Sequence, residues 1–415
     1  MRNDRTPLAV LPALAIMLAA NAAVAAELDP QASDRIERGR YLTVVGDCAG
    51  CHTLPGSGKD FAGGRPIETP FGTLIGSNIT ADPETGIGAW TDDEFVNALT
   101  RGTGRNGTHL YPAMPYTYFT KVTRDDALAI RAYLNTVPVV HHAVRSNQLP
   151  FPFNVRASLI GWDALFLKTG VYRPIADKSP EWNRGGYLAE GLAHCGMCHT
   201  PKNTLGGDKT DENLQGYALQ GWFAPNITND KRVGVGGWSV DDIAEYLKTG
   251  HNRTSAASGP MSEMVTLSTS QMTDADVRAI AVYLKDQPGP EPKAPPAADA
   301  GMIKMGKSIY ADECTACHGS DGKGTPAMFP SINGAAVVQQ SDASSLMRVV
   351  LRGARSAATD QAPTAPAMPA FGWLLNDEQV AAVVTYIRNA WGNAAPPVSA
   401  SDVTKARKDL VERND

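Results

Sequence analysis

The pattern Cys-x-x-Cys-His occurs three times in the chain, and it constrains the fold more than any other feature. The copies span residues 48–52, 195–199 and 314–318. Two thiols two residues apart can reach both vinyl groups of one porphyrin, and the adjacent histidine can reach the iron, so each copy predicts a c-type haem attachment site. The expected attachment residues are Cys48, Cys51, Cys195, Cys198, Cys314 and Cys317, with His52, His199 and His318 as iron ligands.

Cysteine usage separates this interpretation from its rivals. The three motifs use all 6 cysteines, so none is left for a disulfide or a reactive thiol. A zinc site would need a second ligand pair at close spacing, and a redox dithiol would need a neighbouring βαβ pattern. Neither accompanies any copy. The sequence therefore predicts three covalently bound haem c groups, and the chemistry of such a protein belongs to its cofactors.

A methionine on a proline-containing loop follows each motif, and we expect it as the sixth iron ligand. The pairs are His52 and Met114, His199 and Met261, and His318 and Met368. The separation is 62 residues in the first two pairs and 50 in the third. A methionine is more often core filler, but the repeated spacing favours ligation. Methionine–histidine ligation raises the reduction potential and fills both axial positions, so such irons pass single electrons.

Other side chains compete for the sixth position, namely Met264, Met328, His109 and His251. Met264 breaks the spacing match, and Met328 follows the third motif too closely to cross the ring. Bis-histidine irons would need loop histidines, which are more often solvated. The other histidines, His141, His142 and His194, are not expected as ligands, and three prolines are weaker candidates for lining the haem edge, namely Pro70, Pro225 and Pro330.

Strings around the first motif recur around the second. They are Arg-Gly-x-Tyr-Leu from residues 38 and 184, Asn-Ile-Thr from 78 and 226, and Trp-x-x-Asp from 90 and 238. The third motif has a shorter form of the same surroundings. Such internal similarity indicates a repeated unit, and 415 residues suffice for two to four domains. We predict an all-α fold of three tandem class I cytochrome c-like domains.

The expected divisions are a signal peptide (1–26), cytochrome c domain 1 (27–137), an apolar connector (138–180), domain 2 (181–287), a Pro/Ala linker (288–300), domain 3 (301–394) and a charged C-terminal tail (395–415). The first segment has a positive start, an apolar run and a small-residue cleavage site, as secretory signals do. Export suits c-type haem attachment, so we expect a periplasmic protein on the outer face of the inner membrane. The formal charge of −5 argues against a nucleic-acid partner.

Local signals predict several helix boundaries. We expect helices over residues 36–45, 91–101 and 124–135, with Gly102 ending the second. The expected N-caps are Thr91, Thr123, Ser239 and Thr273. In each domain the first and last helices should cross at a glycine, namely Gly39, Gly185 and Gly306. No alternating stretch is long enough to predict a sheet.

The connector is richer in apolar residues than the linker, and it contains an expected amphipathic helix with Leu159, Ile160, Trp162, Leu165 and Phe166. Two interpretations remain open. It is either a strap that packs domain 1 onto domain 2, or a docking surface for another subunit or a membrane.

Nearly the whole mature chain resembles the triheme cytochrome c subunits of bacterial periplasmic dehydrogenases. The resemblance is carried by residues 76–80, 82–88, 111–116, 181–185, 191–195 and 368–371, which read GSNIT, DPETGIG, YPAMPY, EWNRG, GLAHC and MPAF. It implies a non-catalytic subunit that takes electrons from a partner oxidising a sugar, alcohol or acid. That partner would be of flavin, pyrroloquinoline quinone or molybdenum type.

The same resemblance implies ubiquinone or a terminal oxidase as the acceptor, and peripheral membrane association. In the related subunits this association is often made by the C-terminal region. In this chain that region is short and charged, so it differs from the family pattern of a strong C-terminal anchor. Two rival functions remain. A free periplasmic shuttle would have no fixed partner, and a haem peroxidase would need one iron with an open sixth position.

Overall fold

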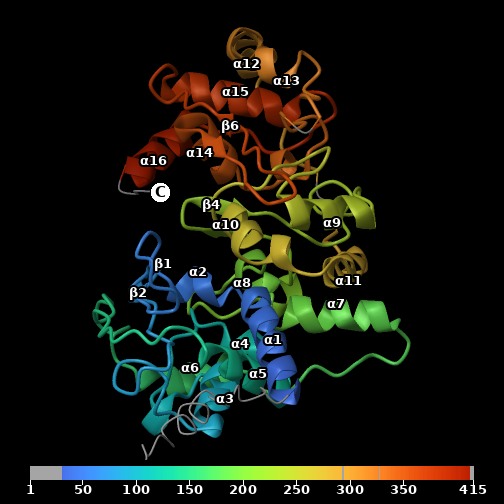
Figure 1. Ribbon diagram of the computed structural model, residues 1–415. Helices are drawn as coiled ribbons and strands as arrows, with labels where there is room; N and C mark the ends of the chain where they lie inside the picture. The colour runs from blue at the N-terminus through green and yellow to red at the C-terminus, as the bar shows by residue number, and fades with distance from the viewer. Residues whose placement is uncertain (1–29, 292–293, 327, 412–415) are drawn as a thin grey trace, which may run out of the picture.

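The computed structural model describes residues 30–291, 294–326 and 328–411, so the expected signal peptide lies outside the described residues. The chain is mainly helical and stacks from its blue N-terminal part to its red C-terminal part (Figure 1). Three helix pairs recur, namely α1 (Pro30–Val45) with α5 (Arg124–Leu134), α7 (Pro180–Glu190) with α11 (Asp274–Lys285), and α12 (Ala300–Glu313) with α15 (Asp377–Asn389). We call residues 30–137, 180–287 and 300–411 the first, second and third units.

Each helix pair crosses at a glycine, as the sequence predicts. A Cβ added at Gly39 would lie 1.8 Å from the carbonyl oxygen of Ala129. The equivalent distances are 1.9 Å at Gly185 and 2.1 Å at Gly306. These are far below any non-bonded contact, so the two backbones approach more closely than a side chain would permit.

The helix signals are confirmed with small shifts of the boundaries. Helix α3 (Asp92–Arg101) begins with a capping box between Thr91 and Glu94 and ends at Gly102, whose φ of 63° is left-handed. Helix α9 (Val240–Thr249) has the same box, and Thr123 and Thr273 cap α5 and α11. Helix α1 starts earlier than expected, at Pro30.

Three two-stranded hairpins correct the expectation of no sheet. They are β1 (Pro66–Thr69) with β2 (Gly72–Ile75), β3 (Tyr217–Leu219) with β4 (Trp222–Ala224), and β5 (Ala354–Arg355) with β6 (Ala367–Met368). All three are antiparallel, and Ala354 pairs with Met368 in the last. Strands of two to four residues are too short to show a period-2 pattern, which is why the sequence did not reveal them.

The short elements complete the fold. The motifs lie on α2 (Cys48–His52), α8 (Cys195–His199) and α13 (Thr315–His318). The other helices are α4 (Tyr116–Phe119), α6 (Ser158–Phe166), α10 (Pro260–Leu267), α14 (Ser344–Arg352) and α16 (Ala400–Val411). Four 3₁₀ turns are η1 (Arg105–Gly107), η2 (Thr210–Glu212), η3 (Thr269–Gln271) and η4 (Ala336–Gln339). The described part of the 288–300 linker is irregular until α12 begins.

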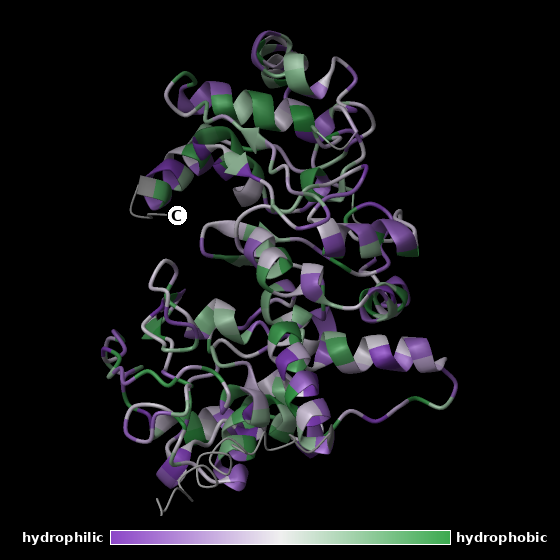
Figure 2. Cartoon of the chain, in the orientation of Figure 1, coloured by the Kyte–Doolittle hydropathy of each residue, from purple (hydrophilic) through white to green (hydrophobic). Residues whose placement is uncertain are grey.

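The first and second units share one hydrophobic core, whereas the third has its own. In Figure 2 the middle of α15 is apolar and its ends are polar. Helix α16 adds Val403 and Leu410 to this core, and Arg407 donates to Asp377 at 3.0 Å. Residues 395–411 of the segment expected as a charged tail are therefore packed on the third unit. Two buried side chains seven residues apart give α16 an apolar side that faces this core.

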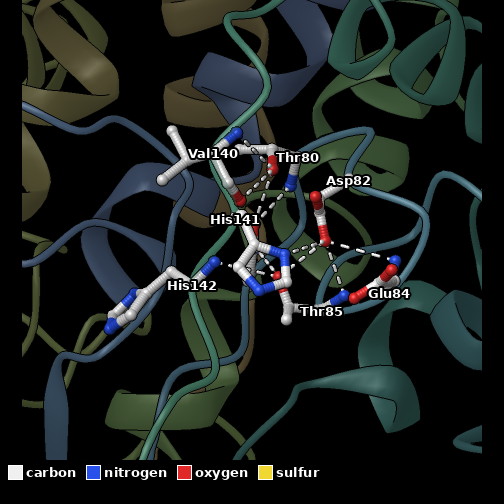
Figure 3. Close-up of polar contacts among 8 residues, drawn as sticks. Thr80, Asp82, Glu84, Thr85, Val140, His141 and His142 are labelled. Carbon is white, nitrogen blue, oxygen red and sulfur yellow. Dashed lines mark hydrogen bonds and ion pairs between the residues drawn. The ribbon is translucent and has the colours of Figure 1, made fainter.

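The connector is tied to both of its neighbours. Its start lies along the loop of residues 78–85 in the first unit, as Figure 3 shows. There the backbone N–H of His142 donates to Thr85 Oγ1 at 2.9 Å, and His141 lies 3.4 Å from Asp82. Further on, Trp162 of α6 donates to the carbonyl of Leu205 in the second unit at 2.8 Å. These contacts support the strap interpretation.

Within the described ranges, none of the helices combines the length and the apolar character that crossing a membrane requires.

Candidate haem-binding sites

Each motif forms a short helix directly after the first helix of its unit. In the first two units the residue before the motif is left-handed, with φ of 46° at Asp47 and 34° at His194. This turn ends the preceding helix and starts the motif on a new axis. The first cysteine of each motif thereby lies about one helical turn from the second cysteine and from the histidine that follows it.

The three motif histidines make the same hydrogen bond. Nδ1 of His52 lies 2.7 Å from the carbonyl oxygen of Ser77, and Nδ1 of His199 lies 2.6 Å from that of Pro225. Nδ1 of His318 lies 3.3 Å from the carbonyl of Pro330. A carbonyl oxygen can only accept, so Nδ1 carries the proton and the neutral ring keeps a lone pair on Nε2. This is the arrangement of a metal-ligating histidine.

Burial favours the uncharged form of the motif side chains. It lowers the pKa of His52, His199 and His318, which keeps these imidazoles neutral. It raises the thiol pKa to about 12 at three cysteines and to about 11 at a fourth, namely Cys48, Cys51, Cys195 and Cys314. Neutral thiols in mainly apolar surroundings differ from the thiolates of a reactive site.

A cavity of about 950 Å³ joins the second and third motifs. Its lining contains both cysteines and the histidine of each, namely Cys195, Cys198, His199, Cys314, Cys317 and His318. Cys51 of the first motif also reaches it. The rest of the lining is mostly apolar and includes Trp222, Val350 and Phe371. A large apolar cavity with a few fixed polar groups is the form of a cofactor site.

Two of the three predicted methionines line this cavity, and the third packs in the core of the first two units. Met368 on β6 and Met261 on α10 both line the cavity. Met114 lies on the turn before α4 and packs against the same core as Cys48. Met264 lines the cavity beside Met261, so the choice between them stays a prediction from spacing. Met328 also lines the cavity, although it is more than half exposed.

Three histidines outside the motifs have partners within the protein. His109 Nδ1 lies 3.1 Å from a carboxylate oxygen of Asp163 on α6. His142 Nδ1 lies 2.8 Å from the carbonyl oxygen of Ala62. His194 is buried against Phe119, with 5.6 Å between ring centroids. Pro70, Pro225 and Pro330 all line the cavity. Pro225 and Pro330 also hold motif histidines through their carbonyls, and in the first unit the carbonyl of Ser77 takes that second role.

A polar corner of the cavity was not found from the sequence. Arg65 of the first unit forms a bidentate ion pair with Glu263 of α10 in the second. Asp47 lies beside this pair, and its Oδ1 is buried without a hydrogen-bond partner. Burial raises the pKa of Asp47 to about 7, with a further contribution from Glu263. No motif marks this cluster, because its members come together only when the two units pack.

The residues present thus fit a covalently held porphyrin, with paired thiols, an oriented imidazole and an apolar cavity. The comparisons with known proteins agree with that chemistry. The family profile described as Cytochrome c matches residues 303–391, which run from α12 through α15 of the third unit.

Relatives cover nearly the full length. The chain is 39% identical to the gluconate 2-dehydrogenase cytochrome c subunit of Pantoea cypripedii, over 93% of this chain and 92% of the relative. It is 37% identical to the cytochrome c subunit of the quinone alcohol dehydrogenase of Gluconacetobacter polyoxogenes, over 95% and 88%. The chain belongs to the cytochrome c subunits of bacterial dehydrogenases. The fructose dehydrogenase cytochrome subunit of Gluconobacter japonicus is also similar, at 37% identity over 90% of this chain and 82% of the relative.

Membership in this family confirms the resemblance seen in the sequence and establishes electron transfer as the role of the chain. The cytochrome c domain at residues 303–391 indicates covalently bound haem c.

Proposed function

We propose that the chain holds three haem c groups in three tandem class I cytochrome c-like domains and relays electrons from a catalytic dehydrogenase subunit. The finding that carries this proposal is the repeated bond from histidine Nδ1 to a backbone carbonyl, at His52, His199 and His318. It recurs in all three units, including the two that lie outside the match to the cytochrome c profile. His142 makes the same bond outside the motifs, to Ala62, but only at the motifs does the bond recur next to a pair of cysteines.

The arrangement of the sites supports a relay. The second and third motifs open on one cavity, and Cys51 of the first reaches the same space. When bound, haem supplies reversible one-electron chemistry at its iron. The chain's own residues attach it through the cysteines, orient the histidine and exclude water with an apolar lining. Met114, Met261 and Met368 are the proposed sixth ligands.

The proposal also covers the catalytic partner, the electron acceptor and the cellular location. The named relatives are subunits of gluconate, alcohol and fructose dehydrogenases, which supports a catalytic partner that oxidises an acid, an alcohol or a sugar. That partner is of flavin, pyrroloquinoline quinone or molybdenum type. The acceptor is ubiquinone or a terminal oxidase, and the protein works in the periplasm on the outer face of the inner membrane.

Haem stoichiometry tests the proposal. The exported wild-type protein should give three haem equivalents by pyridine haemochrome assay, and its mass should show three covalent additions. Replacing both cysteines of one motif, as in C314A/C317A, should remove one equivalent and leave the other two reducible. Two equivalents or fewer in the wild type would overturn the three-haem proposal. Co-purification of a large catalytic subunit separates a dehydrogenase subunit from a free shuttle, and peroxidase activity would favour the other rival.

A further inference from the structure

The peptide bond that holds the histidine of the second motif has a partner on each side. Its carbonyl oxygen, from Pro225, lies 2.6 Å from Nδ1 of His199. Its N–H belongs to Asn226 and donates to Oε1 of Gln340 at 3.3 Å. Gln340 follows η4 in the third unit, 114 residues further along the chain. A side chain of the third unit therefore reaches the histidine of the second motif through a single amide group.

The side-chain amide of Gln340 is fixed in one orientation. Its Nε2 donates to the carbonyl of Val233 at 2.6 Å and to that of Ala336 at 2.8 Å. Both carbonyls can only accept, so both require the NH₂ end of the amide. The oxygen end is thereby turned to the N–H of Asn226, and the reverse placement would set oxygen against oxygen. The side chain is only 3% exposed, so water does not compete for this bond.

The surrounding backbone is held from both sides by the third unit. Arg388 of α15 is fully buried, and its Nη2 donates to the carbonyl of Gln340 at 2.8 Å. Its other donors bond further carbonyls of the third unit. Just before Pro225, the N–H of Phe223 donates to Oγ of Ser345 on α14 at 2.8 Å, and that hydroxyl donates back to the carbonyl of Phe223 at 3.1 Å. The loop that carries the histidine's acceptor is thus set by contacts with another unit.

The other two motifs lack this contact. In the first unit the histidine's acceptor is the carbonyl of Ser77, and within the described residues the N–H that follows, from Asn78, makes no hydrogen bond. In the third unit the acceptor is Pro330, and the N–H of Ser331 likewise makes none there. The side chains of Asn78 and Asn226 each accept from the backbone N–H of the threonine two residues on, so the two loops are otherwise alike. The bond from the third unit is an addition to a shared loop.

Hydrogen bonds that share one amide group polarise one another. An acceptor at the N–H makes the carbonyl oxygen of the same amide more negative, which strengthens its bond to Nδ1 of His199. A stronger acceptor at Nδ1 raises the basicity of the imidazole as an iron ligand. We propose that Gln340 is a positioning residue for the second haem, whose reduction potential it holds below the value that His199 and Pro225 alone would give. This rests on the proposed function only for the haem at the second motif.

Redox titration of full-length, haem-loaded Q340L tests the proposal. Leucine has a similar size and no acceptor, so the carbonyl loses its polarisation and one of the three potentials should rise. At a fixed applied potential the ratio of reduced to oxidised haem at that site should increase ~3-fold, which is ~28 mV for a one-electron couple. Q340N draws the acceptor back by one methylene and should shift the same potential in the same direction. In the C195A/C198A background, which lacks the second haem, Q340L should leave the remaining potentials unchanged.

The sign of the shift separates this role from a packing role. If Gln340 only filled space, its loss would admit water to the second site, and the potential would fall because polar surroundings favour the more highly charged oxidised iron. Q339L is the matched control, since Gln339 is buried in the same segment and bonds Arg232 and Ala394, but not the peptide of Asn226. It should titrate as wild type does. Hydrogen exchange over residues 223–228 should be faster in Q340L and Q340N than in Q339L.

Unchanged potentials in Q340L and Q340N, or a fall in either, would overturn the proposal. So would a rise of equal size in Q339L, because the effect would then belong to the segment and not to this bond. Haem content is measured on the same preparations. Three equivalents with an unresponsive potential would overturn this proposal alone. A peptide with unmodified Cys195 and Cys198 in the wild type would overturn the three-haem proposal, and this one with it.

Discussion

Tyr41 on α1 and Tyr187 on α7 occupy equivalent positions, and each reaches across to the other unit. Tyr41 donates its hydroxyl to Asp276 at 2.6 Å, and Tyr187 donates to Asp126 at 2.5 Å. Each hydroxyl also accepts from the backbone N–H of the N-cap threonine of the helix that it meets. The first two units are thus joined by a reciprocal contact with the form of a two-fold interface within one chain.

Removing these hydroxyls should loosen the joint between the first two units. Each aspartate keeps a guanidinium partner from its own unit, Arg184 at Asp276 and Arg38 at Asp126, so no bare charge is left. We therefore expect Y41F and Y187F each to lower the free energy of unfolding by ~1–2 kcal/mol. The two losses should not simply add in the double variant, because Arg184 bonds Asp276, the acceptor of Tyr41, and also stacks on the ring of Tyr187 at 5.7 Å.

Denaturant unfolding of the haem-loaded protein measures these losses. Y111F is a suitable control, because the hydroxyl of Tyr111 bonds a carbonyl of the connector and makes no contact between the first two units. If Y41F and Y187F unfold at the same denaturant concentration as wild type, the reciprocal contact is not a source of stability.

The sequence predicted those features that depend on local signals. The capping box of Thr91 and the crossing of α1 and α5 at Gly39 are confirmed, because a cap and a helical glycine act on their own neighbourhood. Each motif histidine follows its cysteines on a short helix, but the carbonyls that orient these histidines are backbone atoms and leave no mark in the side-chain pattern. The exchange between Tyr41 and Tyr187 depends on how two units pack, which the repeat alone does not specify.

The crossing glycines should not tolerate even one added carbon. In G185A the new Cβ would meet the carbonyl of Ala279 at 1.9 Å, so the helices must separate and the core they share must open. We expect a loss of ~2 kcal/mol or more, or failure to accumulate the folded protein. G161A is the matched control, because Gly161 is also helical but has nothing within 4 Å of a built Cβ. It should be neutral or stabilising by up to ~1 kcal/mol, measured in the same unfolding experiment.

Helix α16 should behave as part of the third unit. Val403 is fully buried against its core, so V403A should lower the free energy of unfolding by ~1–3 kcal/mol through lost apolar contact and a small cavity. K408A changes an exposed residue of the same helix and should have little effect. Thermal unfolding of the two variants compares them directly. Equal melting temperatures would mean that α16 is a detachable tail.

Each proposed methionine ligand should control one haem. M114A, M261A and M368A should each remove about a third of the long-wavelength charge-transfer absorbance, and each should lower one reduction potential, because thioether ligation raises it. Spectroscopy and redox titration of the purified variants measure both effects. M264A is the matched test, since Met264 lines the cavity next to Met261. A loss in M264A but not in M261A would show that the equal spacing was misleading.

The stability of the protein should depend on pH through Asp47. Its pKa is raised from 3.8 to about 7, chiefly by burial, so the folded protein keeps a proton that the unfolded chain releases above pH ~4. Stability attributable to this group therefore falls as the pH rises from ~4 to ~7 and is lowest above that window. D47N removes the titration and suits the left-handed backbone at this position.

We expect D47N to be more stable than wild type by ~1–3 kcal/mol at pH ~8 and close to it at pH ~4, after allowing for screening and for the neighbouring Arg65–Glu263 pair. D60N neutralises an exposed carboxylate near the first motif and should show no such dependence. Denaturant unfolding at several pH values measures the difference. The raised pKa would be contradicted if D47N and wild type kept a constant separation across this range, because an ionised Asp47 in the folded protein leaves no proton to lose.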